Sequence, residues 1–237
     1  SELKPDDRYQ FIFLTVRENQ VEKALEDISK NKSPNVVTMI NTIKPYGRWE
    51  KICGKGRIIP AFPGAGGCIE GGILDAQLLP RAIQPTTFGE IGGRKSSREE
   101  ALAYIFRKSH IPYQIVPEMH HWQISHLGVI IPLADAYYQS RHPEKICANE
   151  KLMTLTAYRM KKNLKWIAQK GMLCPAKLYM IKDMPTGMLA GVLSRVYQSE
   201  FGNRFLYRHA MHAPEEFQRL HQEFYNYMKT HTKESNK

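Results

Sequence analysis

The sequence is poor in cysteine and lacks the paired motifs of small metal-binding or disulfide-stabilised proteins. Only four cysteines occur in 237 residues, and no two of them form a C-x-x-C pair. A disulfide framework is not expected in a chain of this length, and no ligand spacing supports a zinc site. We therefore expect free thiols in a cytosolic protein and no bound metal.

Membrane-directing features are also missing. The longest apolar stretch, residues 127–136, is interrupted by Pro132 and Asp135 and is too short to cross a bilayer. The polar start, SELKPDDRYQ, is not a signal peptide, so we expect no membrane partner and a cytoplasmic location. The chain opens on Ser1 rather than methionine and soon enters an apolar segment, which predicts a fragment of a longer protein.

Charge is unevenly distributed along the chain. The net charge is +11, and residues 141–237 hold 17 Lys and Arg against 8 Asp and Glu. A basic half attracts nucleic acid, an anionic membrane surface or a phosphorylated ligand. We favour a solvated lysine-rich helical face, because Lys161, Lys162 and Lys165 fall in one predicted helix without an interleaved aromatic stacking platform. Nucleic acid is therefore not the expected partner.

Residues 9–41 contain the clearest structural pattern. Apolar runs over residues 11–16 and 36–40 predict two strands covered on both faces. The helix between them is predicted from apolar residues at i, i+3, i+4 and i+7: Val21, Ala24, Leu25 and Ile28. This order predicts a right-handed βαβ unit. Arg17 and Asn41 follow the two strands at their carboxyl ends, where open α/β sheets bind ligands.

A glycine-rich stretch follows a predicted short helix (45–52) and a third strand (57–62). A dinucleotide-binding fingerprint needs G-x-G-x-x-G at the start of a helix, and Ile69 occupies the third glycine position here. Two extended segments, residues 73–79 and 86–92, follow in place of a helix. We therefore favour a turn into a β-hairpin over a phosphate cradle.

The second half of the chain is predicted to be helical. Ser97-x-x-Glu100 is a predicted capping box, and residues 113–116 form a last strand. Beyond Glu118 only helices are predicted. They span residues 119–139 with a kink at Pro132, 149–170 with Gly171 as C′ residue, and a last helix from Pro214 before a disordered tail, THTKESNK.

Several segments together resemble one family. They are FIFLTVRENQVEKAL, VVTMIN, the glycine-rich turn that leads to FGEIGG, the Trp122 region, Gly171 to Pro175, and Met184-Pro185. Over nearly the whole chain they resemble the ketopantoate reductases, NADPH-dependent 2-oxoacid reductases with a Rossmann domain and a helical domain. The resemblance implies an α/β fold class, with an incomplete Rossmann-like sheet in residues 1–117 and an all-α C-terminal domain in 118–237. The family's N-terminal βαβ unit, with its glycine-rich turn, is absent.

The resemblance implies NADP as cofactor and a 2-oxoacid-like substrate. We also expect a homodimer, because a sheet that lacks its first units has an uncovered edge and an exposed apolar face. It places cofactor contacts at Thr15, Arg17, Gln20 and Asn41, with Arg17 where the family has a lysine. The family's general-acid lysine aligns with Ile124, which cannot protonate an alkoxide, and its nearby asparagine aligns with Gly128. The implied catalytic residues are therefore Arg17, Asn41 and His126, with His126 as a substitute acid because imidazole titrates near neutrality.

Each candidate has a plain structural alternative. Arg17 is expected either to bind a carboxylate or phosphate or to form a salt bridge at the start of a helix. Asn41 contacts a ligand or caps the next turn. His126 is an acid, or it is a hydrogen-bonded histidine of the core or surface. His209 and His212, at i and i+3, are too few to make a convincing metal site, and Asp135 either solvates the kink or is a buried carboxylate near the cleft.

Two functional hypotheses follow. The first is an oxidoreductase of the ketopantoate reductase type with altered active-site residues. The second is a non-catalytic binding or interaction protein on the same scaffold. Ile124 in place of the family's general-acid lysine favours the non-catalytic protein, and the retained Asn41 favours the reductase.

Overall fold

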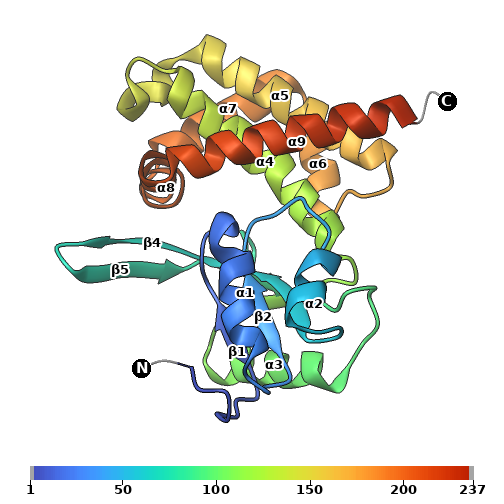
Figure 1. Ribbon diagram of the computed structural model, residues 1–237. Helices are drawn as coiled ribbons and strands as arrows, with labels where there is room; N and C mark the ends of the chain where they lie inside the picture. The colour runs from blue at the N-terminus through green and yellow to red at the C-terminus, as the bar shows by residue number, and fades with distance from the viewer. Residues whose placement is uncertain (1–2, 235–237) are drawn as a thin grey trace. The chain divides into compact units, whose positions relative to one another are not determined.

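A computed structural model describes residues 3–234, apart from the side chains of Cys68, Glu70, Lys233 and Glu234. The chain divides into two compact units (Figure 1). The first unit reaches Ala65 and resumes from Leu78 to His120. The second unit holds Gly66–Gln77 and the chain from His121 onward.

A five-stranded sheet forms the centre of the first unit, in the order β1-β2-β3-β6-β7. The strands are β1 (Ile12–Leu14), β2 (Val36–Met39), β3 (Ile58–Phe62), β6 (Thr86–Phe88) and β7 (Tyr113–Ile115). The first three are parallel, with Ile12 opposite Val36 and Val36 opposite Ile58. β6 is antiparallel to β3 and parallel to β7. Helix α1 (Val21–Ser29) connects β1 to β2, so the predicted βαβ order is confirmed.

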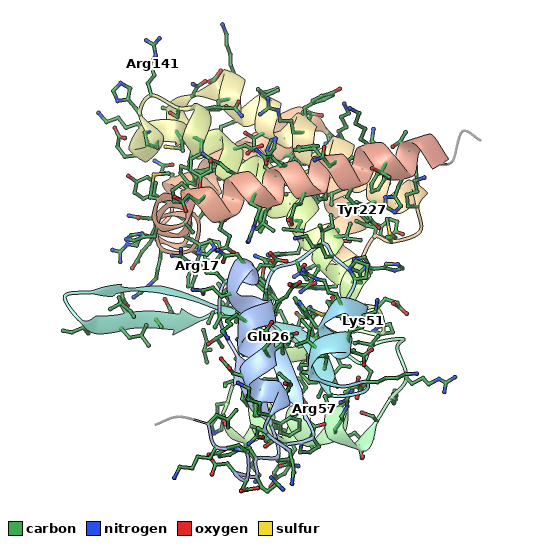
Figure 2. The ribbon with its side chains drawn as sticks, viewed as in Figure 1. Arg17, Glu26, Lys51, Arg57, Arg141 and Tyr227 are labelled. Carbon is green, nitrogen blue, oxygen red and sulfur yellow. The ribbon has the colours of Figure 1, made fainter. Side chains whose placement is uncertain are left out.

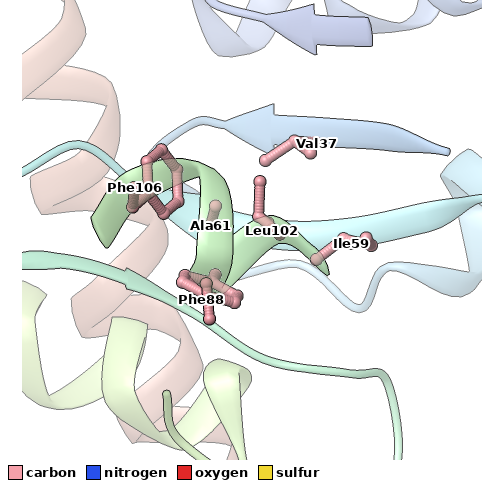
Figure 3. Close-up of a cluster of buried hydrophobic side chains, with 7 residues drawn as sticks. Val37, Ile59, Ala61, Phe88, Leu102 and Phe106 are labelled. Carbon is pink, nitrogen blue, oxygen red and sulfur yellow. The ribbon is translucent and has the colours of Figure 1, made fainter. Parts of the chain in front are cut away.

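Helices cover both faces of this sheet. Side chains from β2, β3 and β6 pack against α3 (Ser97–Lys108) in a buried cluster of Val37, Ile59, Ala61, Phe88, Leu102, Ala103 and Phe106 (Figure 3). Because side chains alternate along a strand, the fully buried Val36 and Ile58 point to the opposite face. There α1 presents Val21, Leu25 and Ile28, the face that the sequence predicts.

Two local predictions for this unit are corrected by the structure, and a third is confirmed. β1 is an edge strand, and Phe13 is 41% exposed, so this strand is not covered on both faces. The cap of α3 is Ser96, whose side chain accepts from the Glu99 N–H at 3.1 Å, rather than Ser97 with Glu100. The predicted helix over residues 45–52 is found as α2 (Gly47–Cys53).

The glycine-rich stretch is itself a strand, and not a turn that leads into a hairpin. β4 (Ala65–Glu70) pairs with β5 (Ile73–Leu78) in a separate two-stranded sheet. Gly71 and Gly72 form its turn with φ of 57° and 80°, which glycine adopts at little cost. The second predicted extended segment instead supplies β6 to the main sheet.

The second unit is helical apart from the hairpin residues Gly66–Gln77. Its elements are α4 (Met119–Gln139, from His121 onward), η2 (Pro143–Ala148), α5 (Glu150–Gln169), α6 (Lys177–Asp183), α7 (Thr186–Gln198), the π-helical η3 (Gly202–Tyr207), α8 (Arg208–His212) and α9 (Pro214–Glu234). The main sheet followed by these helices confirms the predicted fold class. Within residues 3–234, no helix has the length and apolar character needed to cross a membrane.

Helix ends in this unit largely follow the sequence signals. The Asn149 side chain accepts from the Leu152 N–H at 3.1 Å and caps α5, and Gly171 follows α5 with φ of 70°. α9 begins at Pro214, as predicted. It continues to Glu234, so the predicted disorder of residues 230–234 is wrong, and residues 235–237 lie outside the described part.

Candidate functional site

The carboxyl ends of β1 and β2 lie side by side, because these strands are parallel and Leu14 is opposite Thr38. Thr15 and Arg17 follow β1, and Asn41 follows β2. The structure therefore brings the predicted residues of the first unit to one edge of the sheet. Their binding and catalytic roles remain predictions.

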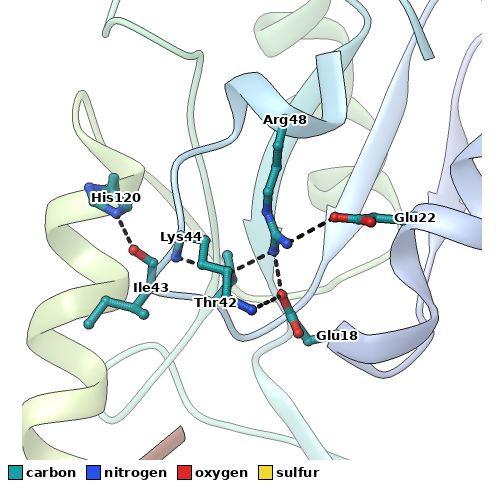
Figure 4. Close-up of polar contacts among 7 residues, drawn as sticks. All are labelled: Glu18, Glu22, Thr42, Ile43, Lys44, Arg48 and His120. Carbon is teal, nitrogen blue, oxygen red and sulfur yellow. Dashed lines mark hydrogen bonds and ion pairs between the residues drawn. The ribbon is translucent and has the colours of Figure 1, made fainter. Parts of the chain in front are cut away.

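A buried carboxylate organises this edge (Figure 4). Glu18, in the turn η1 (Glu18–Gln20), has a side chain that is only 4% exposed. It accepts from Arg48 of α2 and from Lys44 Nζ, the latter at 3.3 Å. Arg48 also pairs with Glu22 of α1 at 3.2 Å and reaches Thr42 Oγ1 at 3.4 Å. Two cations thus compensate one buried negative charge and join α1, α2 and the loop after β2.

Sequence reasoning missed Glu18, Lys44 and Arg48. Their types are ordinary for a surface loop, and nothing in their spacing shows that they meet. Only the fold brings them together, since 26 to 30 residues separate Glu18 from its two partners.

Arg17 and Gln20 have different environments at this edge. Gln20 Oε1 accepts from the Arg17 N–H at 3.3 Å, so this amide closes the turn before α1. The Arg17 guanidinium is exposed (Figure 2) and has no ion pair within residues 3–234. The salt-bridge alternative for Arg17 is therefore not realised in this part of the chain, and the guanidinium is available for an anion.

Asn41 is the most informative of the predicted residues. It is 9% exposed, and its Oδ1 is buried without a hydrogen-bond partner in the described chain. The capping alternative is filled by another residue, because Thr42 Oγ1 accepts from the Lys44 N–H at 3.1 Å. Buried acceptors in folded proteins almost always have a donor. Asn41 Oδ1 therefore marks a place where a ligand or a water can donate.

His120 also contacts the loop after β2. Its Nε2 lies 2.8 Å from the Ile43 carbonyl oxygen, and its ring meets Tyr46 edge-on at 5.9 Å. Burial raises the pKa of Tyr46, with a smaller contribution from the charge of Glu118. Tyr46 thus stays a neutral phenol, and His120 positions the loop that carries Asn41.

His126 lies in the helical unit, in a setting that keeps it neutral. Its ring stacks on Trp122, with centroids 5.0 Å apart and planes 8° apart. Burial lowers the pKa of His126 to about 3, and His209 adds a smaller effect in the same direction. At neutral pH this imidazole carries no imidazolium proton to give to an alkoxide. Its predicted catalytic role is untested, but its protonation state does not favour that role.

The positions aligned with the family's lysine and asparagine are closed by packing. Ile124 is fully buried in the helical unit. At Gly128, a Cβ would lie 2.7 Å from Ile167 Cδ1 and 3.6 Å from Phe224 Cζ, because α4, α5 and α9 meet there. Asn163 Nδ2 donates to the Gly128 carbonyl at 3.2 Å. A side chain at residue 128 would have to displace the side chain of Ile167.

The remaining candidates in this unit have structural partners. His221 Nδ1 lies 2.9 Å from Asp135 Oδ2, which joins α9 to α4. Burial raises the pKa of Asp135, and His221 opposes the shift. His209 stacks edge-on to Phe217 at 5.2 Å, and His212 Nδ1 lies 2.7 Å from the Arg208 carbonyl. Within residues 3–234, no three His, Cys, Asp or Glu side chains are grouped to hold a metal.

A dinucleotide pyrophosphate has no cradle in the described chain. Close packing requires glycine at residues 64 and 66. A Cβ at Gly64 would lie 2.2 Å from the Thr86 N, and a Cβ at Gly66 would lie 2.3 Å from Phe205 Cδ1. Glu18 precedes α1 and Glu22 lies in its first turn, and both carboxylates pair with Arg48. Within residues 3–234, this edge therefore offers a buried acceptor at Asn41 and an exposed guanidinium at Arg17.

Comparison with known proteins supports the fold assignment. No protein-family model and no curated protein matches the sequence. A 2-dehydropantoate 2-reductase from Geobacter metallireducens has a TM-score of 0.60 at 16% identity, over 92% of this chain and 77% of that one. A dimeric ketopantoate reductase from Staphylococcus aureus has a TM-score of 0.58 at 11% identity, over 96% and 78%. D-mandelate dehydrogenase with NADH and anilino(oxo)acetate has a TM-score of 0.50 at 14% identity, over 97% and 79%.

The chain therefore has a fold that it shares with ketopantoate reductases and related dehydrogenases. The more particular match is to the ketopantoate reductases, as the sequence resemblance implies. Identities of 11% and 16% establish a common fold, so activity has to be argued from the residues of the site.

Proposed function

We propose that this chain is an NADPH-linked oxidoreductase of the ketopantoate reductase type, which reduces a 2-oxoacid-like carbonyl at the carboxyl edge of β1 and β2. The observation that supports it best is the buried, unpartnered Oδ1 of Asn41 on a ketopantoate reductase scaffold. An unpaired buried acceptor costs about 1–3 kcal/mol, and a bound donor removes this cost.

The residues of the edge have distinct roles in this proposal. The Arg17 guanidinium pairs with the substrate carboxylate through two parallel hydrogen bonds. Asn41 accepts from a hydroxyl or amide of the bound molecule and orients it. Thr15 and Gln20 line the cofactor side. A nicotinamide cofactor held there would supply a hydride to the carbonyl carbon, and water would supply the proton that the resulting alkoxide needs. The Glu18–Arg48 ion pair joins η1, which follows Arg17, to α2, which follows the loop that carries Asn41.

The second candidate is a non-catalytic binding protein on the same scaffold. The observation that favours it is the closed packing at Ile124 and Gly128, where the resemblance places the acid and its asparagine. Hydride transfer to a carbonyl leaves an alkoxide that needs a proton. Ile124 has none to give, and the low pKa of His126 leaves it neutral.

The two candidates are separated by comparing binding with turnover. Calorimetry with 2-oxoacids, with and without NADPH, measures binding, and absorbance at the nicotinamide band measures oxidation. The reductase predicts binding and turnover that both fall in Asn41→Ala and Arg17→Met. The binding protein predicts binding that these variants weaken, with no turnover by any form. Absence of both binding and turnover would contradict both candidates.

Two further proposals concern the state of the protein. We propose a homodimer, since β1 leaves one strand edge of the sheet unpaired in the described chain and Phe13 of this strand is 41% exposed. Light scattering after size-exclusion chromatography tests this. We also propose a cytoplasmic location, which the free thiols of Cys53, Cys147 and Cys174 support. Fluorescence microscopy of a tagged chain tests the location.

A further inference from the structure

A groove with a volume of about 430 Å³ lies on the helical unit. Most of its wall comes from α5, through Tyr158, Lys161, Lys162, Lys165 and Trp166, and α7 adds Thr186. The α5 residues fall at i, i+3, i+4, i+7 and i+8, so they share one face of that helix. The volume is within the range of small-molecule sites. None of these residues belongs to the Asn41 site.

The groove is positively charged and has no compensating carboxylate. Three lysines line it, and within residues 3–234 no acidic side chain does. Lys162 and Lys165 are exposed and make no hydrogen bond or ion pair in the described chain. They stand at i and i+3, so their ammonium groups are neighbours on the helix surface. Two adjacent, unpaired cations favour an anion with more than one charged group.

Lys161 has a different part in the groove. Its ammonium donates to the Met184 carbonyl and to Thr186 Oγ1, the latter at 3.3 Å. These bonds fasten α5 to the start of α7. An ammonium has three protons, so one remains for a ligand. Lys161 therefore fixes the wall of the groove while Lys162 and Lys165 stay available.

Aromatic side chains stand at both ends of the lysine stretch. Tyr158 precedes these lysines and Trp166 follows them, so the aromatic residues flank the lysines and do not interleave with them. Trp166 is held in place because its Nε1 donates to Thr232 Oγ1 at 2.8 Å and its ring meets Tyr227 edge-on at 6.2 Å. Tyr158 is 56% exposed, which leaves its ring open for stacking.

We propose that this groove binds a nucleoside diphosphate, or an organic diphosphate of the same chemistry. The two phosphates meet Lys162 and Lys165, and the planar base stacks on Tyr158 or Trp166. A nucleic-acid strand fits less well. The lining face of α5 from Tyr158 to Trp166 is only about 12 Å long, at 1.5 Å per residue, whereas single-strand sites span about 4–16 nucleotides.

The test uses the full chain with ADP, adenosine, inorganic pyrophosphate and an octamer of adenylate RNA as probes. Tryptophan fluorescence reports on the groove, because Trp49 and Trp122 are buried while Trp166 is partly exposed. We expect ADP to quench this fluorescence and to bind at least about tenfold more tightly than adenosine or pyrophosphate. The quench disappears in Trp166→Phe, while calorimetry still detects binding.

Charge-reversal variants separate the groove from general attraction. Lys162→Glu with Lys165→Glu should weaken ADP binding about 10- to 100-fold. The control, Lys145→Glu with Lys151→Glu, changes the net charge equally at exposed lysines outside the groove and should leave binding unchanged. Tyr158→Ala should weaken it about tenfold. Circular dichroism checks folding, and Lys162→Gln with Lys165→Gln replaces a charge-reversal variant that fails to fold.

Three results would overturn the proposal. The first is an equal loss of affinity in the control pair, which would mean bulk electrostatic attraction. The second is pyrophosphate or adenosine binding as tightly as ADP. The third is RNA binding far more tightly than ADP with a steep salt dependence, which would assign the groove to nucleic acid. Because no groove residue belongs to the Asn41 edge, failure of either proposal leaves the other unaffected.

Discussion

Replacing Asn41 by alanine should weaken ligand binding without destabilising the ligand-free protein. Asn41 Oδ1 is buried and has no partner in the described chain, so its burial costs about 1–3 kcal/mol of stability. Truncation removes this cost and loses a few van der Waals contacts in return. We expect a change in the free energy of unfolding of about 0 to 1.5 kcal/mol, in the stabilising direction.

Asn31 provides a matched control in the same unit. It is 2% exposed, and its Nδ2 donates to the carbonyls of Lys4 and Asp7 at 2.7 and 2.9 Å. Its Oδ1 accepts from the Ser33 N–H at 2.8 Å. Asn31→Ala leaves these groups without partners, so it should destabilise by about 1–3 kcal/mol or more.

Urea denaturation followed by circular dichroism measures both variants without ligand. The two should differ by at least about 1 kcal/mol, and only Asn41→Ala should lose affinity for 2-oxoacids. If Asn41→Ala destabilises the free protein as much as Asn31→Ala does, its Oδ1 has a partner in the native fold. In that case the argument for a ligand at this position fails.

Three other outcomes follow from the structure. Arg48→Met leaves the buried Glu18 with Lys44 alone and should destabilise by about 3 kcal/mol in urea denaturation, whereas Arg81→Met, at an exposed arginine, should have little effect. Gly128→Asn should destabilise by about 1–3 kcal/mol because the new Cβ meets Ile167, and equal stability of this variant and Gly191→Asn, where a Cβ has open space, would contradict the packing argument. The pKa of His126 is about 3 when folded against 6.5 when unfolded, so the unfolded chain binds the extra proton and stability falls as pH drops below about 6.5. At pH 5 the stability lost through His126 amounts to about 2 kcal/mol. His126→Phe should therefore lose less stability than the wild type between pH 7 and pH 5. Parallel losses in the two proteins would show that His126 is not the group responsible.

The parts of the fold that could be predicted are those set by the local spacing of apolar residues. The stripe on α1, the strand after it and the start of α9 at Pro214 all depend on neighbours in the chain, so local patterns specify them. The glycine-rich stretch was misassigned because glycine permits both a turn and a closely packed strand. Only the pairing of β4 with β5 and the contact of Gly66 with Phe205 decide between them.

For the site, the sequence by itself determined that Arg17 and Asn41 follow two parallel strands and therefore meet at one edge of the sheet. Tertiary structure alone decided that Asn41 Oδ1 is buried without a partner, that Glu18 is compensated by Arg48 and Lys44, and that His126 is neutral. Burial and charge compensation depend on residues tens of positions apart. No local pattern contains that information, because the desolvation of a group is set by every segment that packs around it.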